Sequence, residues 1–298
     1  KVLGLLSPFF QEGAKQSLRQ RLKVLPLKEE PMAVHESIDG VVVRVWDAGE
    51  NDRYLSVLTA EKGRITILSK GSRSIRSTQL SVSQLYTYGN FEFYRRGIRY
   101  ILKDGTAYQP FYGLTMDMDR MNLAAYLCEL TCELTDEGEE AGEMLRLLLN
   151  ALHAIAYGIR PPEQVKGAFE IRAAVLSGYE PELSGCSGCG VRNSDPFYLD
   201  VMNGALWCRD CWTHRQKAVP SADPYADDPR EAEIICILSP AVTAAFRYCR
   251  TAPLERILSF ELKDPADLAA FAKAAETYIL SHVGHGFEAL NFYHTMRR

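Results

Sequence analysis

The sequence predicts a multidomain α+β protein, in which a five-stranded β-barrel is followed by an α-helical domain that carries a four-cysteine module. Three observations lead to this prediction. Short runs rich in β-branched and aromatic residues fill residues 36–110, patterns of helical period fill most of the remainder, and two CxxC pairs interrupt the helical part. A length of 298 residues is enough for two or three domains.

The first of these regions is expected to contain five or more short strands. ESIDGVVVRVW leads into YLSVLT and RITILS, which are joined by the turn-forming EKG, and FEFY and RYIL follow on either side of RRG. GSRSIRSTQ is polar and has no apolar period, so a loop is expected there. No helix-length pattern interrupts the strands, which argues against a Rossmann unit. The strand count predicts an N-terminal closed barrel of the oligonucleotide-binding (OB) type.

Helical periodicity begins after the barrel. MDRMNLAAYLCELTCELT places Met121, Ala125, Cys128 and Cys132 close to one stripe, at steps of three or four residues. EEAGEMLRLLLNALHAIAYG and PPEQVKGAFEIRAAVLSG predict two more helices, each with a glycine as its expected stop.

Two further helices are expected after the cysteines, in SPAVTAAFRYCRTAP and DPADLAAFAKAAETYILSHVG. Ser239 and Asp264 are the expected caps, because each stands directly before a proline that suits the first helical position. No internal repeat is visible. The helical part is therefore expected to continue on both sides of the cysteine module.

These changes of pattern predict the domain boundaries. Residues 1–31 have little periodicity and precede Met32, the expected natural start, so they are interpreted as an extension of unclear status. The predicted order is then an OB-fold barrel at 32–110, the first part of the helical domain at 111–185, a four-cysteine zinc module at 186–215, and the linker VPSADPYADDP with the C-terminal helices at 216–298.

Two CxxC pairs, Cys186 with Cys189 and Cys208 with Cys211, are separated by eighteen residues. Zinc prefers four tetrahedral ligands, and two such turns at this spacing supply four thiolates. FYLDVMNGALWC between the pairs predicts a hairpin. A redox dithiol would instead be a single CxxC that opens a helix, and plain buried thiols are the other alternative. The pattern predicts one structural zinc ion per chain, because all four ligands come from the protein.

The other four cysteines carry weaker signals. Cys128 and Cys132 are four residues apart on a predicted helix and could reach a common ion, but their stripe is otherwise apolar. Cys236 and Cys249 also lie in apolar segments that are expected to be helical. All four are interpreted as small hydrophobic residues of the core.

No motif of a catalytic site stands out. A zinc deaminase needs HxE with PCxxC and an open metal position, and neither motif is found. The phosphate-binding GxxxxGK[ST] loop and the GxSxG elbow are missing as well, so we expect a protein that is not an enzyme. No apolar run reaches the roughly 20 residues of a membrane span. The N-terminus lacks the pattern of a signal peptide, and a cytoplasmic location is expected.

Charge is unevenly distributed along the chain. Residues 32–110 carry eleven Lys and Arg against eight Asp and Glu, whereas residues 111–298 carry seventeen against twenty-seven. The cations of the barrel gather in and around its expected loops, and aromatic rings are interleaved with them. A cationic groove with stacking rings is the combination that binds single-stranded nucleic acid. The alternative is that the rings belong to the core and the arginines to a solvated surface. The rings are Tyr54, Tyr86, Tyr88, Phe91, Phe93, Tyr94 and Tyr100.

Several segments resemble the RecO family of bacterial recombination mediators. GVVVRVWDAGENDRYLSVLTAEKGRITILSKGSR (40–73) is similar to the N-terminal barrel of the family, and AAYLCELTCEL (124–134) to its first helix after the barrel. FEIRAAVLSGYEPELSGCSGCG (169–190) with GALWCRDC (204–211) resembles its junction between helix and zinc site. The resemblance covers about residues 32–298, is loose after residue 239, and does not include residues 1–31.

This resemblance implies a DNA repair and recombination protein that binds single- and double-stranded DNA and anneals complementary strands. It would act with RecR to load RecA on DNA coated by the single-stranded-DNA-binding protein, in the bacterial cytoplasm at the nucleoid. DNA is placed on the barrel, and the zinc ligands are the four cysteines named above. The basic positions that carry over are Arg44, Arg53, Lys70, Arg73 and Arg76.

The acidic tail of the single-stranded-DNA-binding protein is expected to dock on the helical part. In SPAVTAAFRYCR and the segment after it, Phe246 and Cys249 would supply an apolar floor, and Arg247, Arg250 and Arg256 would pair with carboxylates. The alternative is that Phe246 belongs to the core. A different class of function also fits the sequence, namely a zinc-ribbon scaffold or transcription-associated adaptor whose barrel binds protein instead of DNA.

Overall fold

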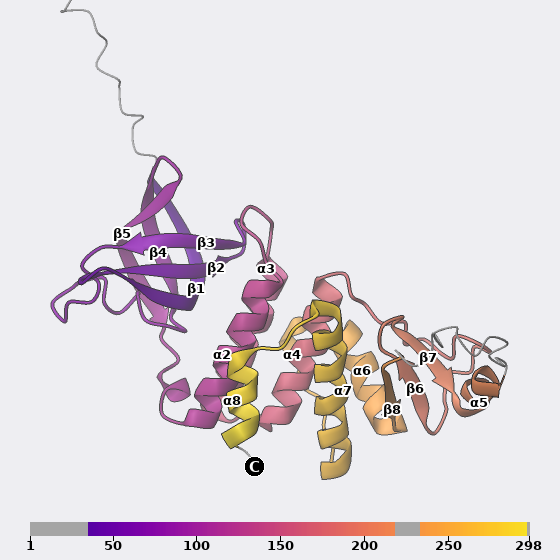
Figure 1. Ribbon diagram of the computed structural model, residues 1–298. Coiled ribbons are helices and arrows are strands. Elements are labelled where there is room, and N and C mark those ends of the chain that lie inside the picture. The colour runs from indigo at the N-terminus through magenta and orange to yellow at the C-terminus, as the bar shows by residue number, and fades with distance from the viewer. Residues whose placement is uncertain (1–34, 218–232, 297–298) are drawn as a thin grey trace, which may run out of the picture. The chain divides into compact units, whose positions relative to one another are not determined.

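The computed structural model describes residues 35–217 and 233–296 (Figure 1). The predicted extension and the predicted linker VPSADPYADDP lie outside the described residues. The barrel strands are β1 (His35–Ala48), β2 (Asp52–Thr59), β3 (Arg64–Ser69), β4 (Tyr88–Arg96) and β5 (Arg99–Gln109). The elements that follow are η1 (Tyr112–Leu114), α2 (Met118–Glu133), α3 (Gly142–Tyr157), α4 (Pro162–Leu176), β6 (Phe197–Asp200), β7 (Ala205–Cys208), α5 (Arg209–Lys217), β8 (Ile235–Leu238), α6 (Pro240–Thr251), η2 (Leu254–Arg256), α7 (Pro265–Val283) and α8 (Glu288–Met296).

The first five strands form a closed barrel in the order β1-β2-β3-β5-β4. β1 with β2, β2 with β3, and β4 with β5 pair antiparallel, whereas β3 and β5 are parallel and pair Ile67 with Tyr100. Alternate side chains point inward because successive strand residues face opposite sides. The barrel has its own core, and the prediction of a five-stranded OB-type barrel is confirmed. The buried core residues are Ile38, Val42, Leu55, Val57, Ile65, Ile67, Val82, Phe91, Phe93 and Leu102.

The turn between β2 and β3 is hydrogen-bonded to the segment that joins α2 to α3. The N–H of Gly138 donates to the carbonyl of Lys62 at 3.0 Å, and the N–H of Ala141 donates to the carbonyl of Ala60 at 2.8 Å. Gly63 has a φ of 59°, and a Cβ there would lie 2.0 Å from the carbonyl oxygen of Asp136. Only glycine fits this close approach between the two backbones.

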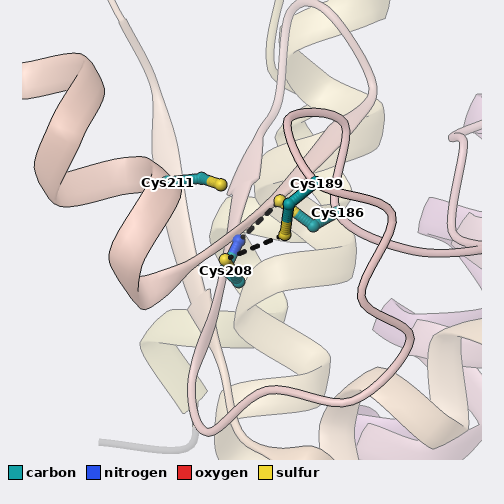
Figure 2. A group of neighbouring side chains, drawn as sticks. All are labelled: Cys186, Cys189, Cys208 and Cys211. Carbon is teal, nitrogen blue, oxygen red and sulfur yellow. Dashed lines mark hydrogen bonds between the residues drawn. The ribbon is translucent and has the colours of Figure 1, made fainter.

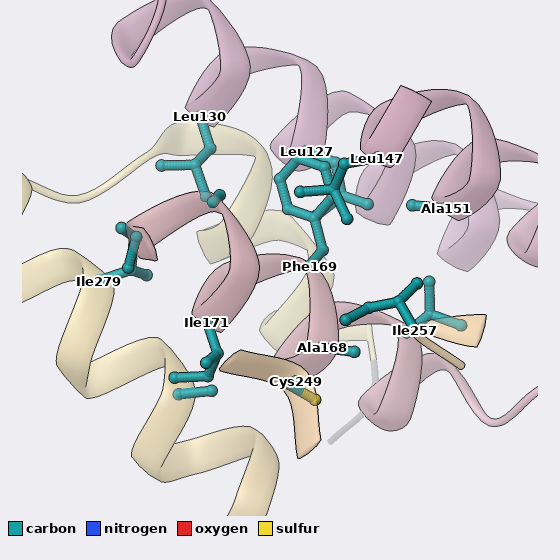
Figure 3. Packing of buried hydrophobic residues seen from close by; sticks show 14 of the residues in the cluster. Leu127, Leu130, Leu147, Ala151, Ala168, Phe169, Ile171, Cys249, Ile257 and Ile279 are labelled. Carbon is teal, nitrogen blue, oxygen red and sulfur yellow. The ribbon is translucent and has the colours of Figure 1, made fainter. Parts of the chain in front are cut away.

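The helical domain packs around α4. Figure 3 shows Phe169 of α4 pointing toward Leu127 of α2 and Leu147 of α3, and all three side chains are buried. α4 also lies directly against α7, since a Cβ on Gly167 would be 2.5 Å from the ring of Phe271. These residues belong to one continuous apolar core, which extends to Val41, Val43 and Leu58 on the outer face of the barrel. The prediction of a helical domain after the barrel is confirmed.

The predicted helix ends are confirmed by their caps. The hydroxyl of Ser239 accepts the N–H of Val242 at 3.2 Å, and the carboxylate of Asp264 accepts the N–H of Ala266 at 2.8 Å. The predicted stripe on α2 is only partly right. Cys128 is buried, but the other three residues of the stripe are half-buried. The fully buried face is formed by leucines that contact neighbouring helices, namely Leu123, Leu127 and Leu130.

Three short elements have no counterpart in the sequence prediction. β8 adds a strand to the predicted β6–β7 hairpin, and the resulting sheet has the order β7-β6-β8. α5 and α8 have nine residues each. Segments of this length carry little periodic signal and are stabilised mainly by tertiary contacts.

A network of charged side chains is buried between α4 and α7. Lys166 Nζ lies 3.0 Å from a carboxylate oxygen of Glu170 and 2.8 Å from one of Glu276. The hydroxyl of Tyr126 donates to Glu170 at 2.8 Å, and His294 of α8 lies 2.9 Å from Glu276. Burial raises the pKa of Glu170 to about 7, although Lys166 lowers it. Burial acts to lower the pKa of Lys166, but the two glutamates raise it above its ordinary value, and the ammonium stays charged.

Candidate metal centre and nucleic-acid interface

The four predicted zinc ligands come from three segments of the chain. Cys186 and Cys189 lie in the loop after α4, Cys208 is the last residue of β7, and Cys211 lies in the first turn of α5. The β6–β7 hairpin runs in the register Phe197↔Cys208 and reverses the chain, which returns the second pair of cysteines to the first. Figure 2 shows the four side chains close together, with Cys211 reaching in from its helix.

The geometry of this cluster suits one thiolate-bound metal ion. All four Sγ atoms lie within 4.8 Å of one another, and the Sγ atoms of Cys189 and Cys208 are 3.7 Å apart. Sulfurs about 2.3 Å from a tetrahedral zinc ion are separated by about 3.8 Å. Among the described residues, no second group of three or more His, Cys, Asp or Glu side chains converges in this way. The cluster is compatible with a structural metal.

The backbone around the cluster favours a thiolate at Cys186. Burial by itself raises the pKa of this thiol, but backbone N–H donors, among them those of Cys208 at 3.2 Å and Gly188 at 3.4 Å, lower it to about 6. Gly188 also leaves room for the thiol of Cys211, because a Cβ at position 188 would lie 3.0 Å from the Sγ of Cys211 and 3.1 Å from the ring of Trp207. A side chain at this position would displace the cysteine cluster.

The remaining cysteines lie apart from this cluster. Cys128 and Cys249 are buried, and Cys132 and Cys236 are half-buried. Burial raises the pKa of all four thiols above the ordinary value. They belong to or pack against the helical core, as the sequence predicts. The predicted helical setting is wrong for Cys236, which lies in strand β8.

At one end of the barrel, the loop after β3 folds against the β1–β2 turn. The backbone N–H of Arg73 donates to the carbonyl of Asn51 at 3.1 Å, and its guanidinium donates to the carbonyl of Gly49 at 2.9 Å. The N–H of Gly71 donates to the carboxylate of Asp52 at 2.8 Å. These bonds hold the predicted basic loop close to β1 and β2.

Four of the five predicted DNA-contacting cations are brought to this end of the barrel. Arg53 Nε and Arg73 Nη1 lie 3.7 Å and 3.5 Å from the carboxylate of Asp47, and Lys70 and Arg76 are exposed on the same loop. We call Arg53, Lys70, Arg73 and Arg76 the loop-end cations. The sequence does not predict a part for Asp47, because it is twenty-six residues from Arg73 and nothing in the local pattern joins the two.

Arg44 lies away from the loop-end cations. It is paired with Ser56 on the neighbouring strand, three positions along β1 from Asp47, which corresponds to about 10 Å. Arg44 lines a cleft of about 580 Å³ between the barrel and the helical domain, where Glu129 and Glu133 lie on the α2 side. The surroundings of Arg44 are therefore of mixed charge.

The aromatic rings singled out from the sequence are mostly not on the surface. Phe91 and Phe93 lie in the barrel core, and Tyr86 is buried. Tyr54, Tyr88, Tyr94 and Tyr100 are half-buried. Most of these rings follow the core alternative that the sequence leaves open.

The predicted partner-binding residues on α6 are largely engaged within the protein. Phe246 is fully buried against Phe271, with ring centroids 5.6 Å apart, so it offers no surface to a peptide. Arg247 donates to the backbone carbonyls of Leu183 at 2.7 Å and Arg192 at 2.8 Å. Phe246 is therefore a core residue, which is the alternative stated in the sequence analysis, because α6 directs its ring toward α7.

Two predicted partner-binding cations lie nearer the surface. Arg250 pairs with Glu180 at 2.6 Å, and Arg256 is exposed in η2. A pocket of about 460 Å³ beside Arg250 is also lined by Arg192 and Leu183. The sequence does not point to Arg192, because this residue is far along the chain from α6. It lies in the loop between α4 and β6 that carries Cys186 and Cys189, which we call the cysteine loop.

No helix among the described residues combines the length and the hydropathy that crossing a bilayer requires.

Comparison with known proteins covers both parts of the chain. Residues 32–111 match the family described as Recombination protein O N terminal, and residues 116–227 match Recombination protein O C terminal. The chain is 25% identical over 259 residues to the DNA repair protein RecO of Acetivibrio thermocellus, which covers 87% of this chain and 96% of that protein. It is 31% identical over 173 residues to the DNA repair protein RecO of Alkaliphilus metalliredigens, covering 58% of this chain and 70% of that protein. With both family regions present in order and the barrel, helical domain and cysteine cluster in place, the chain belongs to the RecO family of DNA repair and recombination proteins.

Proposed function

We propose that this protein is a recombination mediator. It binds single- and double-stranded DNA, anneals complementary strands, and acts with RecR to load RecA on DNA coated by the single-stranded-DNA-binding protein. The observation that carries the proposal is the group of loop-end cations, which is presented on an OB-type barrel in a chain of the RecO family.

In this proposal, the loop-end cations contact the phosphate backbone. Phosphate contacts are electrostatic and largely independent of sequence, and they release condensed counterions. Asp47 orients Arg53 and Arg73 and reduces the net charge of the group. Arg44 belongs to the proposed site as an outlying contact on the outer face of β1.

We also propose that Cys186, Cys189, Cys208 and Cys211 hold one structural zinc ion. When bound, zinc would join the cysteine loop, β7 and α5 through four thiolates and would leave no open coordination position. Elemental analysis of the purified protein should find one zinc per chain. Absence of metal together with free alkylation of all four thiols in the native protein would refute this assignment.

The tail of the single-stranded-DNA-binding protein is proposed to dock beside α6. Arg250 and Arg256, with Arg192 nearby, supply the cations for an acidic peptide. The apolar floor that the sequence suggests at Phe246 is not part of this proposal, since that ring is buried. Arg247 acts here by holding the cysteine loop against α6.

The mediator proposal is tested by annealing of complementary strands coated with the single-stranded-DNA-binding protein, with and without RecR. Arg73→Glu with Arg76→Glu should slow annealing at least tenfold. The matched control reverses two exposed cations of the helical domain, Arg146→Glu with Lys263→Glu, and should leave the rate within about twofold. Equal effects of the two double variants would show that only net charge matters. A wild-type protein that neither binds nor anneals DNA would instead favour the adaptor alternative.

A further inference from the structure

Two aromatic rings are stacked on the outer face of the barrel. Trp46 of β1 and Tyr54 of β2 are cross-strand partners, and their ring centroids are 5.5 Å apart with an interplanar angle of 25°. Neither ring belongs to the barrel core or to the helical core. Trp46 is 39% exposed, whereas most of the barrel's other rings are buried or half-buried. The exposed part of the indole leaves apolar surface in contact with water, and the stacked ring of Tyr54 fixes its orientation.

One cation lies beside this ring pair on the outer face, and others lie at the adjoining end of the barrel. The guanidinium carbon of Arg44 lies 5.8 Å from the centroid of the Trp46 ring. Beyond the rings, Asp47 and Arg53 are the next cross-strand pair along β1 and β2, so their side chains alternate to the opposite face of the sheet, at the end of the barrel where the loop-end cations gather. Arg44 and the rings therefore share the outer face, and the loop-end cations follow at the end of the barrel.

We infer that Trp46 and Tyr54 form a stacking platform for unpaired DNA bases, and that this platform makes the protein prefer single-stranded over double-stranded DNA. The inference rests on the proposed DNA-binding function and adds a base-contacting element to it. Arg44 on the outer face and the loop-end cations at the end of the barrel would hold phosphates of one strand, and a base of the nucleotides between them would lie against the indole of Trp46. Stacking of this kind tolerates any sequence, because every base has a π-face.

The preference for single strands follows from where the faces of the bases are. In a duplex each base is stacked between its neighbours, so its faces are not accessible to a protein ring unless the duplex is distorted. In a single strand the bases are free to leave the stack. The loop-end cations contact phosphates in either form, whereas the platform contributes only when bases are unpaired.

A purely structural role for the ring pair predicts something different. Cross-strand aromatic pairs stabilise hairpins by roughly 0.2–1 kcal/mol, and such a role would affect unfolding but not the response to bases. The test must therefore detect contact between a base and the ring directly, and the fluorescence of Trp46 can do so. The other two tryptophans, Trp207 and Trp212, lie in the cysteine module, so a base bound at the barrel should change only the fluorescence of Trp46.

The experiment compares three DNA probes at one salt concentration: an oligo-dT strand, an abasic oligomer of the same length, and a duplex. Tryptophan fluorescence is followed together with affinity. The dT strand should quench the signal, and the abasic oligomer should bind more weakly with little quenching. Trp46→Leu should remove the quenching and weaken binding of the dT strand about tenfold. The same variant should leave affinity for the abasic oligomer and for the duplex within about twofold.

Two further variants complete the test. Trp46→Phe keeps a ring and should restore most of the affinity for the dT strand. Tyr112→Leu removes a tyrosine that is 68% exposed in η1 and should change nothing. Equal affinity for the dT strand and the abasic oligomer, or a dT affinity unchanged in Trp46→Leu, would overturn the platform while leaving DNA binding intact. Failure of the wild type to bind any of the three probes would overturn both proposals.

Discussion

The helical domain buries some of its charged side chains, whereas the cations of the loop after β3 on the barrel are exposed or half-exposed. In the helical domain, Lys166 and Glu170 are buried and paired with each other, and the thiols of the cysteine cluster face inward toward one another. On the barrel, the exposed loop carries Lys70 and Arg76 at the surface. Polar groups that face inward hold their own fold together, whereas groups that face outward are available to a ligand. Substitutions in the two regions should therefore separate stability from DNA binding.

The largest effect on stability is expected in the cysteine cluster. Cys186→Ser removes one of the proposed metal ligands, and metal binding in small zinc modules contributes roughly 10–16 kcal/mol of apparent folding free energy. The variant should lose its metal, and hydrogen exchange should show that β6, β7 and α5 lose protection. DNA binding by the barrel should stay within about twofold. Cys236→Ser, at a half-buried cysteine outside the cluster, is the control and should retain the metal.

The next largest effect is expected at Lys166. Lys166→Met leaves Glu170 and Glu276 without their buried cation, and breaking a buried ion pair costs about 3–5 kcal/mol. Urea unfolding should report this loss, with DNA affinity unchanged. Lys263→Met, at an exposed lysine of the same domain, should change stability by less than about 0.5 kcal/mol. Equal stability of the two variants would contradict the structural role of the network.

The same network predicts a dependence of stability on pH. Burial raises the pKa of Glu170 from 4.5 to about 7. Its contribution to stability is therefore fully present below about pH 4.5 and is lost as the pH rises through about 7. The side chain of Glu170→Gln cannot ionise, so this variant should not show the loss. As the pH rises from 5 to 8, the difference in unfolding free energy between variant and wild type should shift in favour of the variant, by an amount on the order of 1–3 kcal/mol. Thermal unfolding of both proteins between pH 5 and 8 measures the difference, and parallel curves would refute the raised pKa.

For the loop-end cations, the expected effect is mainly on binding. Arg73→Glu with Arg76→Glu should weaken single-strand binding about ten- to a hundredfold for all sequences alike. The slope of log K against log salt should flatten by roughly 0.7 for each phosphate that the variant no longer neutralises. Arg76→Glu alone should leave the melting temperature unchanged, whereas Arg73→Glu also removes the bond to Gly49 and places a carboxylate near Asp47, so a small fall is expected for the double variant. An unchanged slope would remove these residues from the DNA interface.

The smallest effect is expected for the tail peptide. Arg250→Glu with Arg256→Glu should weaken binding of an acidic tail peptide a few-fold, because exposed ion pairs contribute only about 0–1 kcal/mol each. Fluorescence anisotropy with a labelled peptide measures it. A preserved affinity in a folded double variant would place the docking surface elsewhere on the protein.

Local sequence patterns predict much of this structure. β-branched runs mark the strands, Ser239 and Asp264 mark helix starts, and the spacing of the CxxC pairs predicts the cysteine cluster. Each of these signals acts over a few residues, or through a ligand geometry that requires a certain spacing. They need no knowledge of which elements pack together.

What the sequence does not reveal depends on contacts between distant segments. The pairing of Asp47 with Arg73 exists only after the loop has folded onto the β1–β2 turn. Phe246 fits equally well in the core or in a docking floor until α6 is seen to turn it toward Phe271. The exposure of Trp46 is not predictable from the sequence, because the residue stands at the end of an apolar run and could equally be covered by the helical domain. The structure shows that Trp46 is exposed and that it faces Tyr54 across the β1–β2 pair.

The closure of the barrel has a consequence for the order of folding. β1, β2 and β3 are joined by short turns, as are β4 and β5, so these two groups can form locally. The ring is completed only when β3 pairs with β5 in parallel, bringing Ile67 beside Tyr100 across 33 residues of chain, and such non-local contacts form slowly. The loop after β3 lies within that closing segment. We expect the ability to bind DNA to appear late during refolding, after most secondary structure has formed.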